Sequence, residues 1–318
     1  MIYNIHNILL IKSELDLFPS SFKTKNVNGK LDLIVSLKPN SYFEMQLQYY
    51  DEIMPGIYYL KEEDQMISVI SIFGYKLLLS VQNLLRADHP TLVTMNNNYK
   101  LFTRKLLRVP LSSIFPLEHF LKLIVGTILH QKKATFVFCA GFSLRSKNFL
   151  IASFGSMGKT TLTLEIDKLE TNDFKYLSDD TCIIFDGKVW GYPQDIRVRG
   201  KGFKFFHLEK FHPPSSVINS ELISSFNPDH IVFLEHSEKY KKYSISDRVS
   251  VGKLHSVTNK IFPYGFERNL AALDYLYGFS VKHTNQTNIL INECLSLPGT
   301  VIIGSGNYYI EQLKSMAE

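Results

Sequence analysis

The 318-residue chain has little cysteine and no paired cysteine motif. Its three cysteines, Cys139, Cys182 and Cys294, are far apart and show no CxxC spacing. This pattern argues against a disulfide framework or a cysteine zinc site, and it fits a reducing, cytoplasmic compartment. No run reaches 18 apolar residues, and no basic region precedes an apolar core at the N-terminus, so we expect neither a membrane span nor a signal peptide.

The sequence also lacks a strong excess of either charge. It has 35 Lys and Arg against 30 Asp and Glu, a formal net charge of +5. That surplus suits an anionic ligand such as a nucleotide, but it is not a nucleic-acid signature, and a weakly basic solvated surface is the simpler interpretation. A hydrophobic content of 45% and an aromatic content of 13% indicate a folded protein with no extended disorder.

The chain divides into two predicted domains. Residues 1–112 are rich in β-branched and aromatic residues and turn signals, which predicts a β-rich scaffold or recognition domain without a catalytic motif. Residues 113–318 open with a predicted helix at 116–133. The expected order continues as a strand at 134–144, a strand at 149–153, a helix at 159–170, a strand at 174–178 and a hairpin at 181–192, with a surface loop at 212–230. This order predicts an α/β nucleotide-binding domain.

The stretch "IASFGSMGKTTLTLEI", residues 151–166, resembles a phosphate-binding loop between a strand and a helix. Such a loop turns backbone N–H groups toward a phosphate and adds the partial positive charge of a helix N-terminus. Lys159 would reach the β- and γ-phosphates, and the Thr160 hydroxyl would bind Mg²⁺. Ser153 stands where the usual pattern has glycine, which would cost about 1 kcal/mol if its φ were positive. The candidate nucleotide contacts are Ser153, Gly155, Ser156, Met157, Gly158, Lys159, Thr160 and Thr161.

Two adjacent carboxylates follow twenty residues after Lys159. Asp179 and Asp180 come directly after a strand that we expect beside the phosphate-loop strand. Phosphoryl transfer needs one carboxylate for the metal and another to orient or deprotonate the acceptor hydroxyl. A solvated Asp-Asp turn is the alternative, and the neighbouring phosphate loop favours the catalytic interpretation.

The segments "SFGSMGKTTL", "LSDDT", "IIFDGKVWGYP" and "DIRVR" together resemble the HPr kinase/phosphorylase family, which is related in fold to phosphoenolpyruvate carboxykinase. The resemblance covers roughly residues 115–318. It implies a P-loop kinase domain of that type, preceded here by the β-rich domain, and ATP or GTP with Mg²⁺ as cofactors. It also implies an acceptor hydroxyl on a peptide, protein or small metabolite, and assembly into homo-oligomers.

The resemblance also implies roles for single residues. Lys159 is similar to the family's phosphate lysine, Thr160 to its Mg²⁺ ligand and Asp179 to its catalytic base, while Asp180 would support the metal or the base. Arg197, followed by Arg199, and the more distant Arg268 are candidates for charge stabilisation, with surface salt bridges as the equal alternative.

Departures from the family pattern indicate which activity to expect. Ser153, Gly155 and Ser156 replace the Gly, Ser and Gly of the usual loop, and the preceding strand lacks the His-Gly pair of HPr kinases. These departures favour a kinase-like protein with an acceptor other than HPr. Two alternatives remain: a nucleotide-binding protein without turnover, such as a pseudokinase or regulator, and an assembly protein that uses its β-rich half. A GTPase is disfavoured because Phe262 stands where an NKxD motif needs aspartate.

Overall fold

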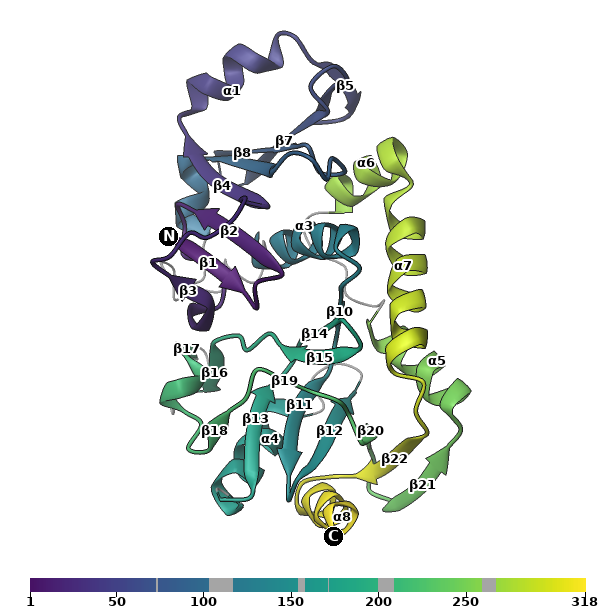
Figure 1. Ribbon diagram of the computed structural model, residues 1–318. Coiled ribbons are helices and arrows are strands. Elements are labelled where there is room, and N and C mark those ends of the chain that lie inside the picture. The colour runs from purple at the N-terminus through teal and green to yellow at the C-terminus, as the bar shows by residue number, and fades with distance from the viewer. Residues whose placement is uncertain (73, 103–116, 154–157, 171, 200–208, 259–266) are drawn as a thin grey trace. The chain divides into compact units, whose positions relative to one another are not determined.

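The computed structural model describes residues 1–318 apart from 73, 103–116, 154–157, 171, 200–208 and 259–266 (Figure 1). The protein is a mixed α/β chain with several sheets. It forms two compact units that alternate along the sequence: the first holds 1–18, 22–132 and 262–284, and the second holds 19–21, 133–261 and 285–318. The sequence predicted one boundary after residue 112, whereas the helix expected to open the second domain, α3 (Leu117–Gln131), packs within the first unit.

The first unit is built on a nine-stranded sheet of order β3-β1-β2-β4-β9-β8-β7-β6-β5. The neighbours β2, β4 and β9 run parallel, and the other pairs are antiparallel. The strands are β1 (Ile2–Ile5), β2 (Leu9–Ser13), β3 (Lys23–Thr24), β4 (Leu33–Lys38), β5 (Asp51–Met54), β6 (Ile57–Leu60), β7 (Gln65–Ile72), β8 (Tyr75–Gln82) and β9 (Thr91–Asn96). The helices are α1 (Asn40–Leu47), η2 (Asn97–Phe102), α3 and α6 (Glu267–Tyr277), together with the start of α7 (Phe279–Cys294). The short helix η1 (Ser20–Phe22) has its first two residues in the second unit and its last in the first.

Local sequence signals explain part of this unit. Pro55 and Gly56 form the turn that joins β5 to β6, and Gly56 has a φ of 74°. A Cβ there would lie 2.7 Å from the backbone oxygen of Val69, so only glycine fits. Strand β8 continues to Gln82, and turns follow it.

The second unit is built on a seven-stranded sheet of order β18-β13-β11-β12-β20-β22-β21. Its strands are β11 (Ala140–Leu144), β12 (Lys147–Ala152), β13 (Phe174–Ser178), β18 (Glu221–Leu222), β20 (His230–His236), β21 (Lys241–Ile245) and β22 (Gly299–Gly304). A four-stranded sheet contains β10 (Thr135–Val137), β14 (Cys182–Phe185), β15 (Lys188–Gly191) and β19 (Ser225–Phe226), and a hairpin pairs β16 (Ile196–Arg199) with β17 (Glu209–His212). The helices are α4 (Lys159–Leu169), η3 (Pro214–Ser216), α5 (Asp247–Thr258), the end of α7 and α8 (Asn307–Ala317).

Both faces of the seven-stranded sheet are buried. Phe149 and Ile151 of β12 belong to one core cluster with residues of α4 and α8, while Leu150 and Ala152 belong to another with residues of α5, α7 and the four-stranded sheet. Successive side chains of a strand point to opposite faces, so the continuous apolar run of β12 lies between two layers. Helix α4 contributes Leu162 and Ile166, which are four residues apart and therefore lie on one face.

Two sequence predictions about strands need correction here. The single strand expected at 134–144 is two strands in two different sheets, β10 and β11, with a break at residues 138–139. The strand before Asp179, β13, does not lie beside the phosphate-loop strand β12, because β11 lies between them and pairs antiparallel with both. Strands β12 and β13 therefore run in the same direction, and their carboxyl ends meet at one edge of the sheet.

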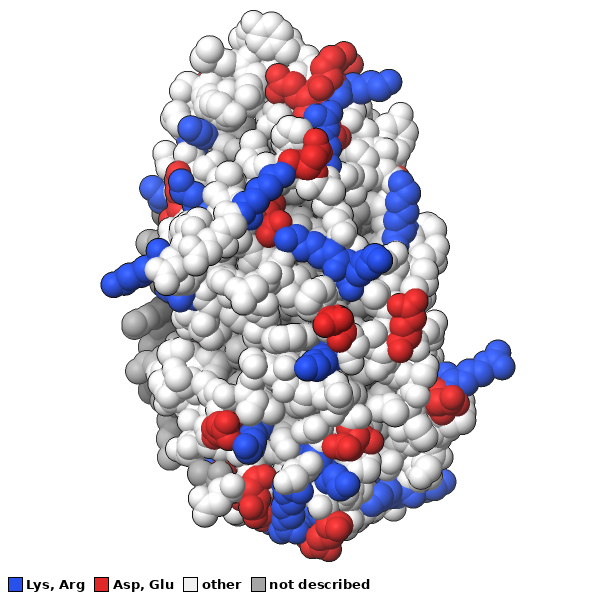
Figure 2. All heavy atoms as spheres, in the orientation of Figure 1, with Lys and Arg blue, Asp and Glu red and all other residues white. Residues whose placement is uncertain are grey.

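Charged side chains of both signs are mixed on the face of the molecule that Figure 2 draws, where Lys and Arg lie interspersed with Asp and Glu. Within the described residues, every helix is too short or too polar to cross a bilayer.

Candidate functional site

Helix α4 begins where the sequence predicts the end of a phosphate loop. The buried strand β12 leads to Ser153, and Gly158 precedes the helix with φ 83° and ψ 19°, a left-handed conformation that glycine adopts without strain. Gly158 offers no side-chain cap, so α4 presents backbone N–H groups without a capping acceptor from that residue. A helix N-terminus of this kind attracts a phosphate. The predicted loop contacts Gly155, Ser156 and Met157 lie outside the described residues.

Ser153 contacts the lysine of the motif. Its side chain is buried, and the Lys159 ammonium donates to the Ser153 hydroxyl at 3.2 Å and to the Ser153 carbonyl oxygen at 3.4 Å. The backbone of Ser153 does not adopt a positive φ, so the strain considered from the sequence does not arise there. The hydroxyl that replaces the usual glycine is therefore a binding partner for Lys159.

Lys159 also lies near the second carboxylate of the Asp pair. Its ammonium is 3.9 Å from Asp180 Oδ1, and its side chain is 10% exposed whereas that of Asp180 is 48% exposed. An ion pair of this length with a half-exposed partner contributes little to stability. The positive charge of Lys159 is thus available to an anionic ligand.

Asp179 is the buried member of the Asp pair. The Thr160 hydroxyl donates to its Oδ2 at 3.0 Å, and the Tyr176 phenol donates to its Oδ1 at 3.3 Å. Burial, and then the negative charge of Asp180, raise the pKa of Asp179 from 3.8 to about 6, against the opposing effect of the two hydrogen bonds. A carboxylate with a pKa close to neutral can accept a proton from a reacting hydroxyl and release it again.

The two carboxylates have different surroundings: Asp179 is buried, Asp180 is half-exposed, and Thr160 bonds to Asp179. The set of oxygen ligands suits Mg²⁺, which binds hydroxyl and carboxylate oxygens and usually keeps phosphate and water ligands as well. Within the described residues there is no group of three or more His, Cys, Asp or Glu that could hold a metal alone. A Mg²⁺ ion held by Thr160 and the Asp pair would therefore need phosphate oxygens to complete its ligands.

The remaining predicted site residues are Thr161, Arg197 and Arg268. Thr161 is exposed on α4. Arg197 lies on β16 with its backbone paired to Phe211, and its side chain, like that of Arg199, is outside the described residues. Arg268 is exposed on α6 and belongs to the first unit, whereas the Lys159 and Asp179 cluster belongs to the second.

The sequence analysis missed two residues that shape the site. Tyr176 lies three residues before Asp179 on the strand that delivers it, and the period of two along a strand would place these side chains on opposite faces, so the sequence pattern gave no signal for their contact. Asp167 is a buried carboxylate on α4 that accepts hydrogen bonds from the backbone N–H groups of Asn219 and Ser220 and from the Asn219 amide, at 2.9 to 3.0 Å. These bonds fix part of the segment expected as a plain surface loop at 212–230, which instead contains η3, β18 and β19.

Comparisons with known proteins give a distant likeness to solved structures. No protein-family model matches the chain, and no curated protein matches it. Among solved structures, the HPr(Ser) kinase/phosphatase from Coxiella burnetii is similar to 57% of this chain and 93% of its own, at 10% sequence identity and a TM-score of 0.30. A TM-score of this size does not establish a shared fold, so the P-loop kinase fold of the HPr-kinase type stays a prediction.

Proposed function

We propose that the chain is a Mg²⁺-dependent phosphotransferase that moves the γ-phosphoryl group of ATP or GTP to a hydroxyl of a peptide, protein or small metabolite. The observation that carries the proposal is the contact between Thr160 and Asp179. It joins the first turn of a helix whose N-cap residue, Gly158, supplies no side-chain cap to a buried carboxylate whose pKa is raised to about 6. The helix turn that would bind the phosphates and the carboxylate that would accept the proton are thus joined by one hydrogen bond, from Thr160 to Asp179.

The chain's own residues would divide the work in the following way. The α4 N-terminus and Lys159 bind the phosphates, since N–H groups and an ammonium both favour negative charge. Bound Mg²⁺, held by the oxygens of Thr160 and Asp180, would supply positive charge to the transferring group. Asp179 orients the acceptor hydroxyl and takes its proton as the oxygen attacks the γ-phosphorus and the nucleoside diphosphate leaves.

One specific observation favours a second candidate function, nucleotide binding without turnover. The Ser153 hydroxyl and carbonyl oxygen both accept from Lys159, which holds the ammonium away from a phosphate unless the ligand displaces them. In a pseudokinase this contact would persist. Ser153→Gly removes the hydroxyl, so faster nucleotide consumption by that variant would favour this second function for the natural chain.

Calorimetric titration with ATP and with GTP, each with Mg²⁺, tests the proposal. Lys159→Ala should abolish nucleotide binding, while Lys168→Ala, which changes an exposed lysine in the last turn of the same helix, should bind normally. Asp179→Asn should retain binding and lose nucleotide consumption. Binding that is unaffected by Lys159→Ala, or turnover that survives Asp179→Asn, would contradict the assignment.

A further inference from the structure

A small cavity in the second unit has in its wall Tyr176, a hydrogen-bond partner of Asp179. Its volume is about 130 Å³, and it is lined by three serines, three prolines and four other residues, none of them charged. That volume is close to that of an engineered cavity that binds benzene, about 150 Å³, so it has room for a single side chain and not for a nucleotide or a sugar. An acceptor group in this cavity must therefore be small and uncharged.

Tyr176 connects the cavity to the proposed phosphate site. Its ring forms part of the cavity wall, and its phenol donates to Asp179 Oδ1 at 3.3 Å. Asp179 in turn accepts from Thr160 at the start of α4. The side chain of Tyr176 thus connects the cavity wall with the carboxylate of the proposed phosphate site, while a second carboxylate, Asp195, bonds to a serine of the cavity.

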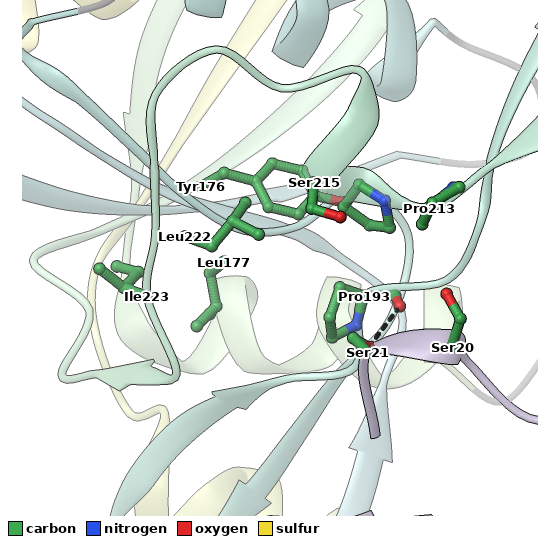
Figure 3. Close-up of a pocket in the computed structure, with 10 residues that line it drawn as sticks. Ser20, Ser21, Tyr176, Leu177, Pro193, Pro213, Ser215, Leu222 and Ile223 are labelled. Carbon is green, nitrogen blue, oxygen red and sulfur yellow. Dashed lines mark hydrogen bonds between the residues drawn. The ribbon is translucent and has the colours of Figure 1, made fainter. Parts of the chain in front are cut away.

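The chain itself places two hydroxyl groups in this cavity. Ser20 and Ser21 lie on the wall formed with Pro193, opposite Tyr176 (Figure 3). The short segment 19–21 belongs to the second unit, although the residues before and after it belong to the first. Neither serine is buried, so both hydroxyls are accessible to a reacting group.

The two serines differ in how their hydroxyls are bonded. Ser20 Oγ donates to the Asp195 carboxylate at 3.1 Å, whereas Ser21 Oγ donates to the Pro193 carbonyl oxygen at 3.4 Å. A carboxylate within about 3.2 Å of a hydroxyl can act as its general base, and a carbonyl oxygen cannot. The contact with Asp195 therefore distinguishes Ser20 as the nucleophile.

We propose that Ser20 is a site of self-phosphorylation, an inference that rests on the proposed phosphotransferase function. In this reaction Ser20 Oγ forms a bond to the γ-phosphorus of the bound nucleotide, and the bond from that phosphorus to the β-phosphate oxygen breaks. The nucleoside diphosphate leaves with the electron pair, and the hydroxyl proton passes to Asp195. The product carries a dianionic phosphate beside the Asp195 carboxylate, and repulsion between them would drive the segment 19–21 away from this position.

Mass spectrometry of the full chain after incubation with ATP and Mg²⁺, followed by removal of the nucleotide, tests the inference. The intact protein should gain the mass of one phosphoryl group, and peptide mapping should place that group on Ser20. Ser20→Ala should lose the modification, and the matched control Ser21→Ala should keep it. Because the segment lies in the same unit as the site, the first-order rate constant should not change with protein concentration.

The variants separate a failure of this inference from a failure of the proposed function. Asp195→Asn should slow the modification of Ser20 at least tenfold while nucleotide binding, measured by calorimetry, stays unchanged. If the chain binds ATP through Lys159 but no phosphate is found on Ser20, or if the rate rises with protein concentration, the self-phosphorylation of Ser20 is wrong and the phosphotransferase proposal stands. If the chain binds no nucleotide, both are wrong.

Discussion

The raised pKa of Asp179 predicts an unusual effect of pH on the stability of the second unit. Burial and the charge of Asp180 raise the pKa of this carboxyl from 3.8 to about 6 in the folded protein. The folded state then holds the proton more tightly than the unfolded state, so the stabilisation is present below pH 3.8 and is lost as pH rises through about 6. A shift of this size corresponds to about 3 kcal/mol of unfolding free energy.

Asp179→Asn isolates this effect, because the amide is similar in shape and does not titrate. The free energy of unfolding should fall with rising pH in the natural chain relative to the variant, by about 2 kcal/mol between pH 4 and pH 8, because the unfolded carboxyl is already partly ionised at pH 4. Urea unfolding followed by Trp190 fluorescence is the assay. Trp190 is the chain's single tryptophan, and it lies half-buried on β15 in the same unit as Asp179. Any constant offset from exchanging an oxygen for an amide nitrogen cancels, since only the pH dependence of the difference is used.

Asp180→Asn is the matched control. It removes the smaller of the two causes that raise the pKa and leaves burial in place, so the drop in stability should persist but become smaller. A difference between the natural chain and Asp179→Asn that stays flat from pH 4 to pH 8, or that favours the natural chain at high pH, would refute the reasoning. That result would mean that the Asp179 carboxyl is ionised in the folded protein without lowering the free energy of unfolding.

Three further substitutions test the local structure by urea unfolding. Gly158→Ala should lower the free energy of unfolding by about 1 kcal/mol, because the φ of Gly158 is positive. Gly252→Ala inside α5, where a Cβ meets no atom within 4 Å, should raise it by up to about 1 kcal/mol. A change of the same sign in both variants would contradict this reasoning. Asp167→Asn should lower the free energy of unfolding by about 2 kcal/mol, because a buried carboxylate that accepts three hydrogen bonds is replaced by an amide that is partly a donor. In the control Asp173→Asn, at an exposed aspartate, the free energy of unfolding should change by less than about 0.5 kcal/mol. Gly191→Ala should destabilise by more than about 2 kcal/mol, since its Cβ would lie 2.5 Å from a backbone carbonyl oxygen of β13; a near-neutral result would show that the strands can separate.

Local features of the site could be predicted from the sequence. These features depend on neighbouring residues in the chain: an apolar run before Ser153, a glycine before Lys159, and a β-forming segment on each side of Asp186-Gly187. The strand β12, the start of α4 and the β14–β15 turn are confirmed, and both turn residues have positive φ.

Long-range packing could not be predicted in the same way. Helix α7 is rich in Thr and Asn, which are poor helix formers, and its formation depends on burying residues such as Thr287 and Ile291. The position of β11 between β12 and β13 depends on which strand edges pair, and the spacing of residues along the chain does not encode that choice. The contact between Ser153 and Lys159 likewise depends on backbone directions that no motif specifies.

The alternation of the two compact units along the chain has a consequence for biosynthesis. The polypeptide passes between the units at residues 18, 21, 132, 261 and 284, so no single cleavage releases either of them intact. The first unit lacks α6 and the start of α7 until residue 284 has left the ribosome, and the second lacks β22, a central strand of its sheet, until residue 304 has followed. Folding of the N-terminal part therefore cannot finish before most of the chain has been made, and the two units must complete their cores nearly together at the end of translation.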